Sequence, residues 1–249
     1  MAGRVKVVSL RRYARNALRR IEHAVIPNSC VFCGGRLRLD AVPVCPGCKA
    51  DLPWIADSCR RCGSPAAAPL PDDVPCGRCQ LEPRPFEAVV VPLQYRFPID
   101  AAIKAFKFHR ALHYAPAFAS ILTDAADRLP AGIDALLPVP LHWRRQAMRG
   151  FNQAREICAP LQRPLGVRII EAVCRRRPTP FQSGLTASAR QQNLRGAFAV
   201  RGGIAARHVL LVDDVLTTGA TCEQLAKVLQ DAGVARVSVL AVARAATPD

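Results

Sequence analysis

The sequence contains no apolar run as long as the roughly 20 residues that a membrane-spanning helix needs. It also shows no apolar signal segment before a small-residue cleavage site, so we expect a cytoplasmic chain without a membrane span. Two glycine-rich phosphate-binding patterns, G-x-x-x-x-G-K-[ST] and G-x-G-x-x-G, are missing, which removes the usual support for P-loop nucleotide hydrolysis and for dinucleotide binding. Aromatic residues make up only 6% of the chain, which argues weakly against a surface that stacks many bases.

Acidic residues and lysine are scarce too. Against 19 acidic residues stand 35 basic ones, which gives a formal net charge of +16, and only five of the basic residues are lysine. The planar guanidinium of arginine makes paired hydrogen bonds to phosphate, so a phosphate-bearing ligand or a nucleic acid suits this composition. Half of the 249 residues are apolar, which is enough for a sizeable α/β core and a small additional module.

Eight of the eleven cysteines form four Cys-x-x-Cys pairs. In a cytoplasmic chain this spacing indicates metal binding, and two such pairs complete a tetrahedral Cys₄ zinc site. Sequential pairing is the simplest arrangement, and a cross-braced pairing of the first pair with the third stays open, as does iron in place of zinc. The sequence therefore predicts two structural zinc ions held by Cys30, Cys33, Cys45, Cys48 and by Cys59, Cys62, Cys76, Cys79. The other three cysteines, Cys158, Cys174 and Cys222, are expected to be buried apolar residues without chemistry.

The pattern of residue types divides the chain into four parts. Residues 1–27 predict a basic amphipathic helix, either a solvated helix over a core or a contact for nucleic acid or a membrane surface. Residues 28–80 form the cysteine module, 81–87 a linker, and 88–249 an α/β domain with a parallel sheet flanked by helices. Strands are expected near 88–95, 134–140, 167–173, 208–213 and 236–243, and helices near 99–108, 113–128, 152–163 and 220–232.

The segment 209–221 carries the clearest functional pattern. Val209 to Val212 predicts a strand buried on both faces, and Asp213 and Asp214 follow at its carboxyl end, where α/β proteins bind ligands. Carboxylates there accept hydrogen bonds from vicinal sugar hydroxyls or hold Mg²⁺ through water. The next residues offer hydroxyls and backbone N–H groups at the start of a helix, which suits a phosphate; they are Thr217, Thr218, Gly219, Ala220 and Thr221. A ribose 5-phosphate site explains both halves better than helix capping alone.

A second stretch leaves a strand into a loop rich in proline and arginine. We expect this loop to hold pyrophosphate, with a proline-shaped turn followed by a helix capped by Asn152 as the alternative. Its candidate residues are Pro138, Val139, Pro140, Leu141, His142, Arg144, Arg145 and Arg149. The polar segment 175–198 is long for a connection and suggests a lid over a charged substrate. Lys104 to Arg110 forms a further basic patch, in which His109, like His142, is as well explained by structure as by catalysis.

Together these residues resemble a known family. The 209–221 segment is similar to the phosphoribosyl-pyrophosphate (PRPP) motif of type I phosphoribosyltransferases. The four cysteine pairs, the 104–108 patch, residues 138–142 and 149–153, and the segments 182–198 and 209–221 resemble the ComF family of competence proteins, over nearly the whole chain except residues 1–27. The resemblance implies a double zinc ribbon joined to a phosphoribosyltransferase-like domain. It also implies that Asp213 and Asp214 contact the PRPP ribose, 217–221 the 5-phosphate and 138–145 the pyrophosphate, and that some members take part in uptake of transforming DNA beside competence-machinery proteins.

Two classes of function follow. The first is a phosphoribosyltransferase that binds PRPP with Mg²⁺, with Asp213 and Asp214 as catalytic residues beside the positive charge developing at C1 of the ribose. The second is a non-catalytic PRPP or nucleotide sensor that binds single-stranded DNA or RNA through its zinc ribbons and basic surface. No residue type in the sequence identifies an acceptor substrate.

Overall fold

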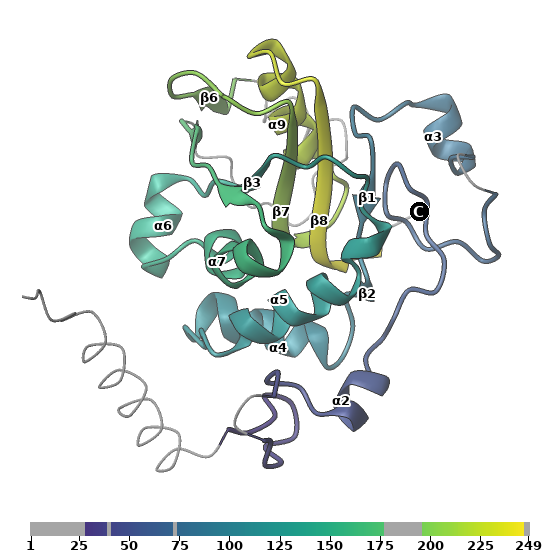
Figure 1. Ribbon diagram of the computed structural model, residues 1–249, viewed down its shortest axis with the longest axis vertical. Coiled ribbons are helices and arrows are strands. Elements are labelled where there is room, and N and C mark those ends of the chain that lie inside the picture. Colours follow the sequence, from purple (N-terminus) through teal and green to yellow (C-terminus); the bar gives the residue numbers. More distant parts are fainter. Residues whose placement is uncertain (1–27, 39–40, 72–73, 177–195, 247–249) are drawn as a thin grey trace, which may run out of the picture. The chain divides into compact units, whose positions relative to one another are not determined.

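The computed structural model describes residues 28–38, 41–71, 74–176 and 196–246 (Figure 1). These residues belong to two compact units, which divide between Asp51 and Leu52. The division falls inside the predicted cysteine module 28–80, so the four predicted domain boundaries stay a prediction. The basic helix expected at 1–27 and residues 177–195 of the expected lid lie outside the described residues.

The unit that ends at Asp51 contains a cysteine turn and one short helix. Ser29 pairs with Arg36 in an isolated antiparallel bridge around the turn of Cys30 to Gly35. Cys45 caps the N-terminus of helix α2 (Pro46–Ala50), and its Sγ accepts a hydrogen bond from the backbone N–H of Cys48 at 3.3 Å. Proline at the first helical position suits this start, because its missing N–H would have no partner there.

The unit that starts at Leu52 is built on a parallel sheet. The strand order is β1 (Val89–Val90), β8 (Arg236–Arg244), β7 (His208–Leu216), β3 (Ala135–Pro138) and β4 (Arg168–Ile169), and β2 (Leu93–Gln94) also pairs with β8. All these pairs are parallel. Val209 to Val212 are fully buried, as predicted for a strand covered on both faces.

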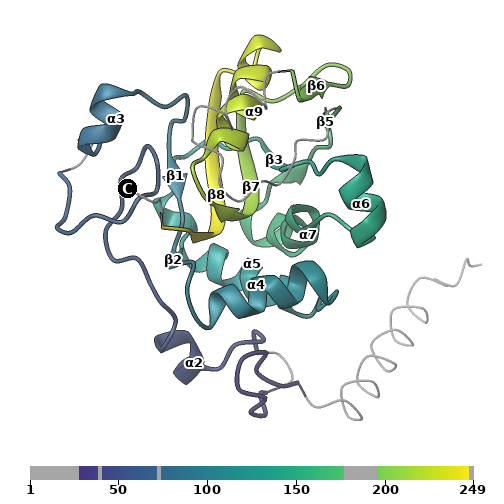
Figure 2. The ribbon, with the colours of Figure 1, turned by 180° about the vertical axis from the view of Figure 1, so that it is seen from behind.

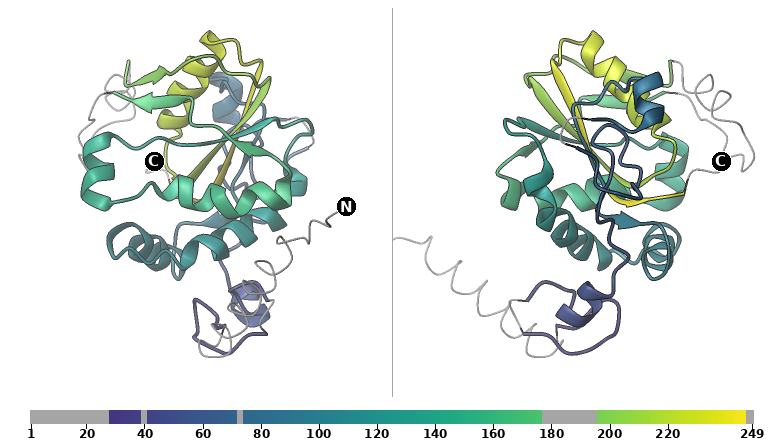
Figure 3. Two further views of the ribbon diagram at one scale, coloured as in Figure 1. Left: turned by 60° about the vertical axis from the view of Figure 1, so that its left-hand side comes forward. Right: turned by 90° about the vertical axis from the view of Figure 1, so that its right-hand side faces the viewer.

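Helices cover the two faces of this sheet. Helix α9 (Ala220–Asp231) packs with Leu225 and Leu229 against alternate residues of β7 and β8, including Leu211 and Val239. Helix α7 (Gln153–Leu165) packs on β7 and β3, while α5 (Tyr114–Asp124) packs on β8 and on α7. Helix α4 (Ile99–Phe108) packs on α5, and the 3-10 turn η1 (Ala126–Arg128) follows α5 (Figures 1 and 3). The predicted α/β class is confirmed.

Three local expectations need correction. Strand β7 continues to Leu216 because its pairing with β8 runs on to Arg244, so the Asp pair lies within the strand rather than after it. Residues 143–149 form helix α6 (Trp143–Arg149), which ends at Gly150 with a φ of 85°, although a loop was expected. The single strand expected near 167–173 is divided, because Arg168–Ile169 form β4 of the main sheet while Val173–Arg175 form β5. Strand β5 pairs antiparallel with β6 (Phe198–Val200) in a separate two-stranded sheet, whose β6 packs on α9 (Figure 2).

The chain turns between Cys59 and Ser64, and this second cysteine turn packs on β1 at the edge of the sheet. Helix α3 (Gly77–Leu81) carries Cys79. The backbone N–H of Val89 in β1 donates to the Arg60 carbonyl at 2.6 Å, and Gly63 lies so close that a side-chain carbon there would approach Val89 to 2.9 Å. Gly63 also has a φ of 67°, which glycine adopts without strain. The third and fourth cysteine pairs are therefore part of the α/β unit.

Candidate functional site

The predicted acid pair lies near the carboxyl end of β7. Asp214 is 5% exposed, Asp213 is half-buried, and the backbone N–H of Asp214 donates to Oδ1 of Asp213 at 2.9 Å. Burial, followed by the negative charge of Asp214, raises the pKa of Asp213 to about 7. A carboxyl group with this pKa exchanges a proton near neutral pH, which suits a group beside a reacting sugar.

Lys107 of α4 neutralises part of this acid pair. Its Nζ lies 2.7 Å from Oδ1 of Asp214, and the two side chains are 22% and 7% exposed. The sequence placed Lys107 only in a basic patch and gave it no partner. A lysine in the last turn of a helix was the available signal, but the contact joins residues more than 100 positions apart, so only the fold reveals it.

The predicted phosphate loop turns from β7 into α9. Gly219 is the residue before the first turn of α9 and has a φ of 84°, while the Thr218 hydroxyl accepts from the backbone N–H of Ala220 at 3.4 Å. Thr217 is exposed, Thr218, Gly219 and Thr221 are half-buried, and Ala220 is buried. The free N–H groups at the start of a 12-residue helix suit a phosphate.

The side chain of Glu223 lies beside this loop, since a side-chain carbon at Gly219 would be 3.8 Å from its Oε1. Glu223 lies in the first turn of α9, is buried, and forms an ion pair with Arg84. A negative charge at this position would disfavour a phosphate if it were unpaired, and the arginine compensates it. Arg84 comes from the segment that was predicted only as a linker, so sequence reasoning missed this contribution.

The predicted pyrophosphate residues run from the end of β3 through α6. Pro138, Val139, Pro140 and His142 are buried and Leu141 is half-buried. Nδ1 of His142 accepts from the backbone N–H of Arg144 at 3.2 Å and so caps α6, which favours the structural reading of this histidine. Asn152 caps α7 in the same way, which is the feature that the alternative, structural interpretation of this stretch predicted, and His109 ends α4.

Two arginines, Arg149 and Arg175, bring positive charge towards the acid pair. Burial lowers the pKa of Arg149, and the charge of Asp214 opposes that shift. Burial lowers the pKa of Arg175 to about 10, with Arg145 adding to the effect and Asp213 opposing it. Arg145 and Arg149 were predicted for pyrophosphate, whereas Arg144 instead lies over the exposed ring of Trp143 at 5.3 Å.

A cavity of about 470 Å³ opens beside the predicted pyrophosphate residues. Its walls come from the end of β3, from α6, from the start of α7 and from β5, and they include Pro138, Trp143, Arg155, Glu171, Arg175 and Arg201. Arg155 and Glu171 form an ion pair at 2.7 Å, which leaves the lining positive. The cavity therefore suits an anionic group beside the predicted pyrophosphate residues.

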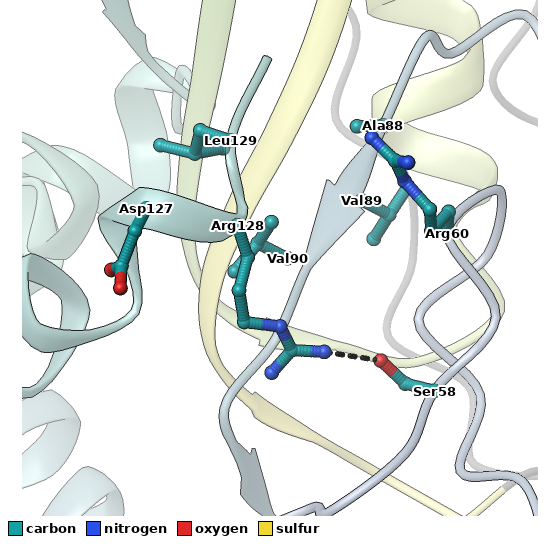
Figure 4. A pocket seen from close by; sticks show the side chains of 8 residues that line it. All are labelled: Ser58, Arg60, Ala88, Val89, Val90, Asp127, Arg128 and Leu129. Carbon is teal, nitrogen blue, oxygen red and sulfur yellow. Dashed lines mark hydrogen bonds between the residues drawn. The ribbon is translucent and has the colours of Figure 1, made fainter. Parts of the chain in front are cut away.

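A second cavity, of about 300 Å³, lies where the second cysteine turn meets β1 (Figure 4). Arg128 donates to the Ser58 hydroxyl across it at 2.8 Å, and Val89 and Val90 form its floor. Strand β8 separates β1 from β7, and no predicted site residue lines this cavity. It belongs to the packing of the cysteine turn on the sheet rather than to the acid pair.

The eight paired cysteines form two separate groups, and the ligand atoms within each group lie within 4.8 Å of one another. The pairing is sequential: Cys30, Cys33, Cys45 and Cys48 form one group, and Cys59, Cys62, Cys76 and Cys79 the other. In each group a backbone N–H donates to a sulfur at 3.3 Å, from Cys45 to Cys30 and from Cys76 to Cys59. Four thiols with such N–H donors are a donor set that fits a tetrahedral zinc ion.

The electrostatics differ among the members of the two groups: burial and the neighbouring cysteines raise the pKa of Cys48, Cys76 and Cys79, whereas one cysteine in each group is shifted the other way. Burial by itself would raise the pKa of Cys30 and of Cys59, but backbone N–H groups lower them to about 6 and about 7. The remaining cysteines of the chain lie apart from both groups, Cys158 and Cys222 being buried and Cys174 half-buried. For the first two, burial raises the pKa, which is consistent with inert apolar residues.

Comparison with known proteins extends these observations. Residues 21–80 match the family described as "Double zinc ribbon domain". DNA utilization protein YhgH of Escherichia coli O6:H1 is 35% identical over 225 residues, which cover 88% of this chain and 98% of that protein. Competence protein F of Haemophilus influenzae is 32% identical, covering 87% and 96%, and competence protein ComFC of Streptococcus pneumoniae is 27% identical, covering 84% and 90%.

Two solved structures are also similar in part. Adenine phosphoribosyltransferase of Leishmania tarentolae matches with a TM-score of 0.33 and 14% identity, over 56% of this chain and 60% of that one. Hypoxanthine phosphoribosyl transferase of Trypanosoma cruzi matches with a TM-score of 0.27 and 18% identity, over 52% and 62%.

A parallel sheet flanked by helices, together with two Cys₄ groups in a segment that matches a zinc-ribbon family, defines an α/β protein with a double zinc ribbon. The identity and coverage of the relatives narrow this class. The chain belongs to the ComF family. Among the described residues, no helix is long and apolar enough to cross a membrane.

Proposed function

We propose that this protein binds PRPP together with Mg²⁺ at the acid pair and the 217–221 loop. One observation carries the proposal: the Asp213 and Asp214 carboxylates lie near the end of β7, and the N-terminus of α9 follows only a few residues later. Asp213 and Asp214 accept hydrogen bonds from the ribose hydroxyls, and backbone N–H groups of 218–221 bind the 5-phosphate. Arg145 and Arg149 compensate the charge of the pyrophosphate.

We propose further that the protein transfers the phosphoribosyl group. The bond between C1 and the pyrophosphate oxygen breaks, a nucleophilic atom of the acceptor bonds to C1, and pyrophosphate leaves with the bonding electrons. Mg²⁺ supplies charge neutralisation to the leaving group. The carboxylates face the positive charge that develops on the ribose, so the contribution of the protein is positional and electrostatic. The positive cavity beside β3 favours an anionic acceptor.

Calorimetry with PRPP and Mg²⁺ tests the binding proposal. Replacing Asp213 and Asp214 by Asn keeps their shape but removes charged acceptors worth about 1.5–3 kcal/mol each, so affinity should fall by at least ~100-fold. Gly219→Val should be comparably severe, because valine resists the positive φ of the loop. Asp134→Asn, at the other end of the sheet, is the control and should bind like wild type. Wild-type protein that fails to bind PRPP contradicts the proposal.

Transfer is tested separately by measuring pyrophosphate release from PRPP with a panel of acidic and neutral nucleobases and amines. Release that depends on the acceptor and is lost in the Asp213 and Asp214 variants supports an enzyme. PRPP binding without release from any acceptor supports the sensor reading.

A second proposed function is binding of single-stranded nucleic acid, in keeping with relatives named for competence and DNA utilization. The specific observation is two aromatic rings beside arginines on α6: Trp143 with Arg144 over it, and Phe108 of α4 with Arg149 at 5.4 Å. The rings are 62% and 68% exposed. Exposed rings between arginines bind bases by stacking and phosphates by charge.

This surface is tested with a fluorescent single-stranded oligonucleotide. Replacing Trp143 and Phe108 by Ala should weaken binding by about tenfold per ring, as expected for loss of one stacked base each. Phe97→Ala removes an equally exposed ring outside α6, 80% exposed, and serves as the control. If the Trp143, Phe108 and Phe97 variants all bind as tightly as wild type, the zinc ribbons or residues 1–27 become the candidate nucleic-acid contact. Partners from the competence machinery stay a hypothesis.

A further inference from the structure

The two lysines of α4 have different surroundings. Lys104 pairs with Asp100 one turn earlier at 2.8 Å, and its side chain is 57% exposed. Lys107 points the other way, to Asp214 of β7, in a contact that is largely shielded from water. Surface pairs along one helix contribute little, whereas a shielded pair between two elements has a strong mutual effect. The second lysine therefore belongs to the site rather than to the helix surface.

Two neighbouring carboxylates without compensation attract a divalent cation. Carboxylate oxygens are the ligands that Mg²⁺ prefers, and Asp213 and Asp214 are adjacent in β7, where the backbone N–H of Asp214 donates to Oδ1 of Asp213. The ammonium group of Lys107 already occupies one of these oxygens. A metal ion arriving alone would meet this positive charge at close range and would have to displace it from Asp214.

An arriving PRPP molecule changes that balance. Its phosphates bring negative charge of their own, and the positive charge of Lys107, Arg145 and Arg149 then attracts the ligand instead of repelling it. A cation that arrives bound to pyrophosphate needs fewer oxygens from the protein, because Mg²⁺ is commonly held by one or two carboxylates together with substrate phosphates.

We propose that Lys107 is a positioning residue that excludes free divalent cations from the Asp213–Asp214 pair, so that the metal ion enters only together with the phosphorylated sugar. The proposal rests on the proposed PRPP site and specifies how that site is regulated. Lys107 also holds Asp214 in one orientation, which leaves the acid pair available to accept hydrogen bonds from sugar hydroxyls.

The test is a titration of the zinc-loaded, full-length protein with Mn²⁺ alone. The electron paramagnetic resonance signal of the unbound ion measures how much Mn²⁺ is bound. Wild type should show no Mn²⁺ binding that depends on Asp214, as judged against Asp214→Asn. Lys107→Met should gain a site with at least about tenfold higher affinity, because removing a unit charge a few ångströms away in a shielded setting has at least that effect. Lys107→Arg keeps the charge and should behave like wild type.

Lys104→Met is the matched control, since it removes a lysine from the same helix without touching the acid pair, and it should leave Mn²⁺ binding unchanged. Lys107→Gln, which keeps a hydrogen-bond donor, replaces Lys107→Met if the latter does not fold, and it should show the same gain. Two results overturn the proposal: Mn²⁺ affinity in the folded Lys107 variants equal to wild type, or wild-type binding of Mn²⁺ alone that Asp214→Asn abolishes.

This outcome is independent of whether PRPP binds, because the first titration contains no PRPP. If neither wild type nor any variant binds PRPP but Lys107→Met gains the Mn²⁺ site, the proposed function and the entry of the metal with the sugar both fail, while the exclusion of free cations by Lys107 stands. If wild type binds PRPP with Mg²⁺ and Lys107→Met gains no Mn²⁺ site, the proposed function stands and the role of Lys107 fails.

Discussion

Gly219 shows how one residue determines the geometry of the phosphate loop. The chain turns from β7 into α9 between Leu216 and Ala220, and Gly219 makes this turn with a φ of 84°. Among the residues that the structure describes there is space for a side-chain carbon here, since the atom nearest to it would be Glu223 Oε1 at 3.8 Å. The requirement for glycine therefore comes from the backbone angle and from the approach of a ligand, not from crowding by the protein.

We expect Gly219→Ala to lower the free energy of unfolding by about 1–2 kcal/mol, the cost of a left-handed angle for a residue with a side chain. Gly219→Asn should cost less, because asparagine tolerates this angle better than alanine. Gly203→Ala is the control, since Gly203 has open space and no positive φ, and it should be neutral or slightly stabilising. Urea denaturation measures all three, and equal stabilities of the Gly219→Ala and Gly203→Ala variants would contradict the strain argument.

Asp213 should make stability depend on pH in an unusual direction. Its pKa is raised to about 7 by burial and by Asp214, so between its ordinary pKa and 7 the folded state binds more protons than the unfolded state. The stability contributed by the protonated carboxyl is thus present at low pH and is lost as the pH rises through 7.

Asp213→Asn should therefore become more stable relative to wild type as the pH rises from about 5 to 8, in buffer without Mg²⁺. Asp134→Asn supplies the contrast: backbone N–H groups of His208 and Arg207 lower the pKa of Asp134, so its ionisation is complete over this range in both states and its difference from wild type should be flat. A flat difference for Asp213→Asn as well would show that its pKa is not raised.

At the scale of elements, Arg244 connects the second cysteine turn to the phosphate loop. This buried arginine ends β8 and donates to the Leu216 carbonyl at 3.0 Å and to the Ser64 hydroxyl at 3.2 Å. Leu216 is the last residue of β7 before the loop, and Ser64 follows Cys62 and Gly63 of the cysteine turn. The Arg244 side chain thus connects the start of the 217–221 loop to the turn that carries cysteines of the second Cys₄ group.

Arg244→Met should lower the free energy of unfolding by about 2–4 kcal/mol, because it removes two hydrogen bonds donated by a buried guanidinium group. Ser64→Ala should cost about 1 kcal/mol, since it removes only one of the two contacts. Arg236→Met is the control on the same strand: its ion pair with Glu87 is partly exposed and should contribute less than about 1 kcal/mol. Denaturant unfolding followed by tryptophan fluorescence compares them, and an Arg244 variant as stable as the Arg236 variant would refute the connection.

At the scale of the whole molecule, net charge is the dominant property. Four thiolates and one Zn²⁺ contribute −2 at each of two sites, so the formal charge of +16 becomes about +12 in the metal-loaded protein. Basic residues exceed acidic ones both in residues 1–85 and in residues 86–249. A surface of this kind binds phosphate backbones without reading sequence.

We expect affinity for a single-stranded oligonucleotide to fall steeply with salt, with a slope near −3 in a plot of log affinity against log salt if about four phosphates are neutralised. Replacing Arg11, Arg12, Arg15 and Arg19 together by Gln tests the predicted helix at 1–27, and a flatter slope would show that it takes part. An unchanged slope would favour the alternative interpretation of residues 1–27 as a solvated helix, and the surface of Trp143 and Phe108 would remain the candidate nucleic-acid contact.

Local chemistry is what the sequence by itself determined. The spacing of the cysteines predicted two Cys₄ groups, the apolar run before Asp213 predicted a buried parallel strand, and Gly219 marked the turn into α9, because each of these depends on residues close together in the chain. Prediction was less accurate where pairing with distant residues extends an element. Strand β7 runs past the acid pair only because β8 lies beside it as far as Arg244.

Only the tertiary structure decided which distant groups meet. It selected sequential over cross-braced cysteine pairing, packed the second cysteine turn on β1, and brought Lys107, Arg84 and Arg244 to the site from segments that had no assigned role. A basic side chain in a sequence carries no sign of its partner, since its reach is several ångströms and its partner is chosen by the packing of whole elements. Burial then sets the consequence, because shielding from water strengthens the Lys107–Asp214 contact and raises the pKa of Asp213.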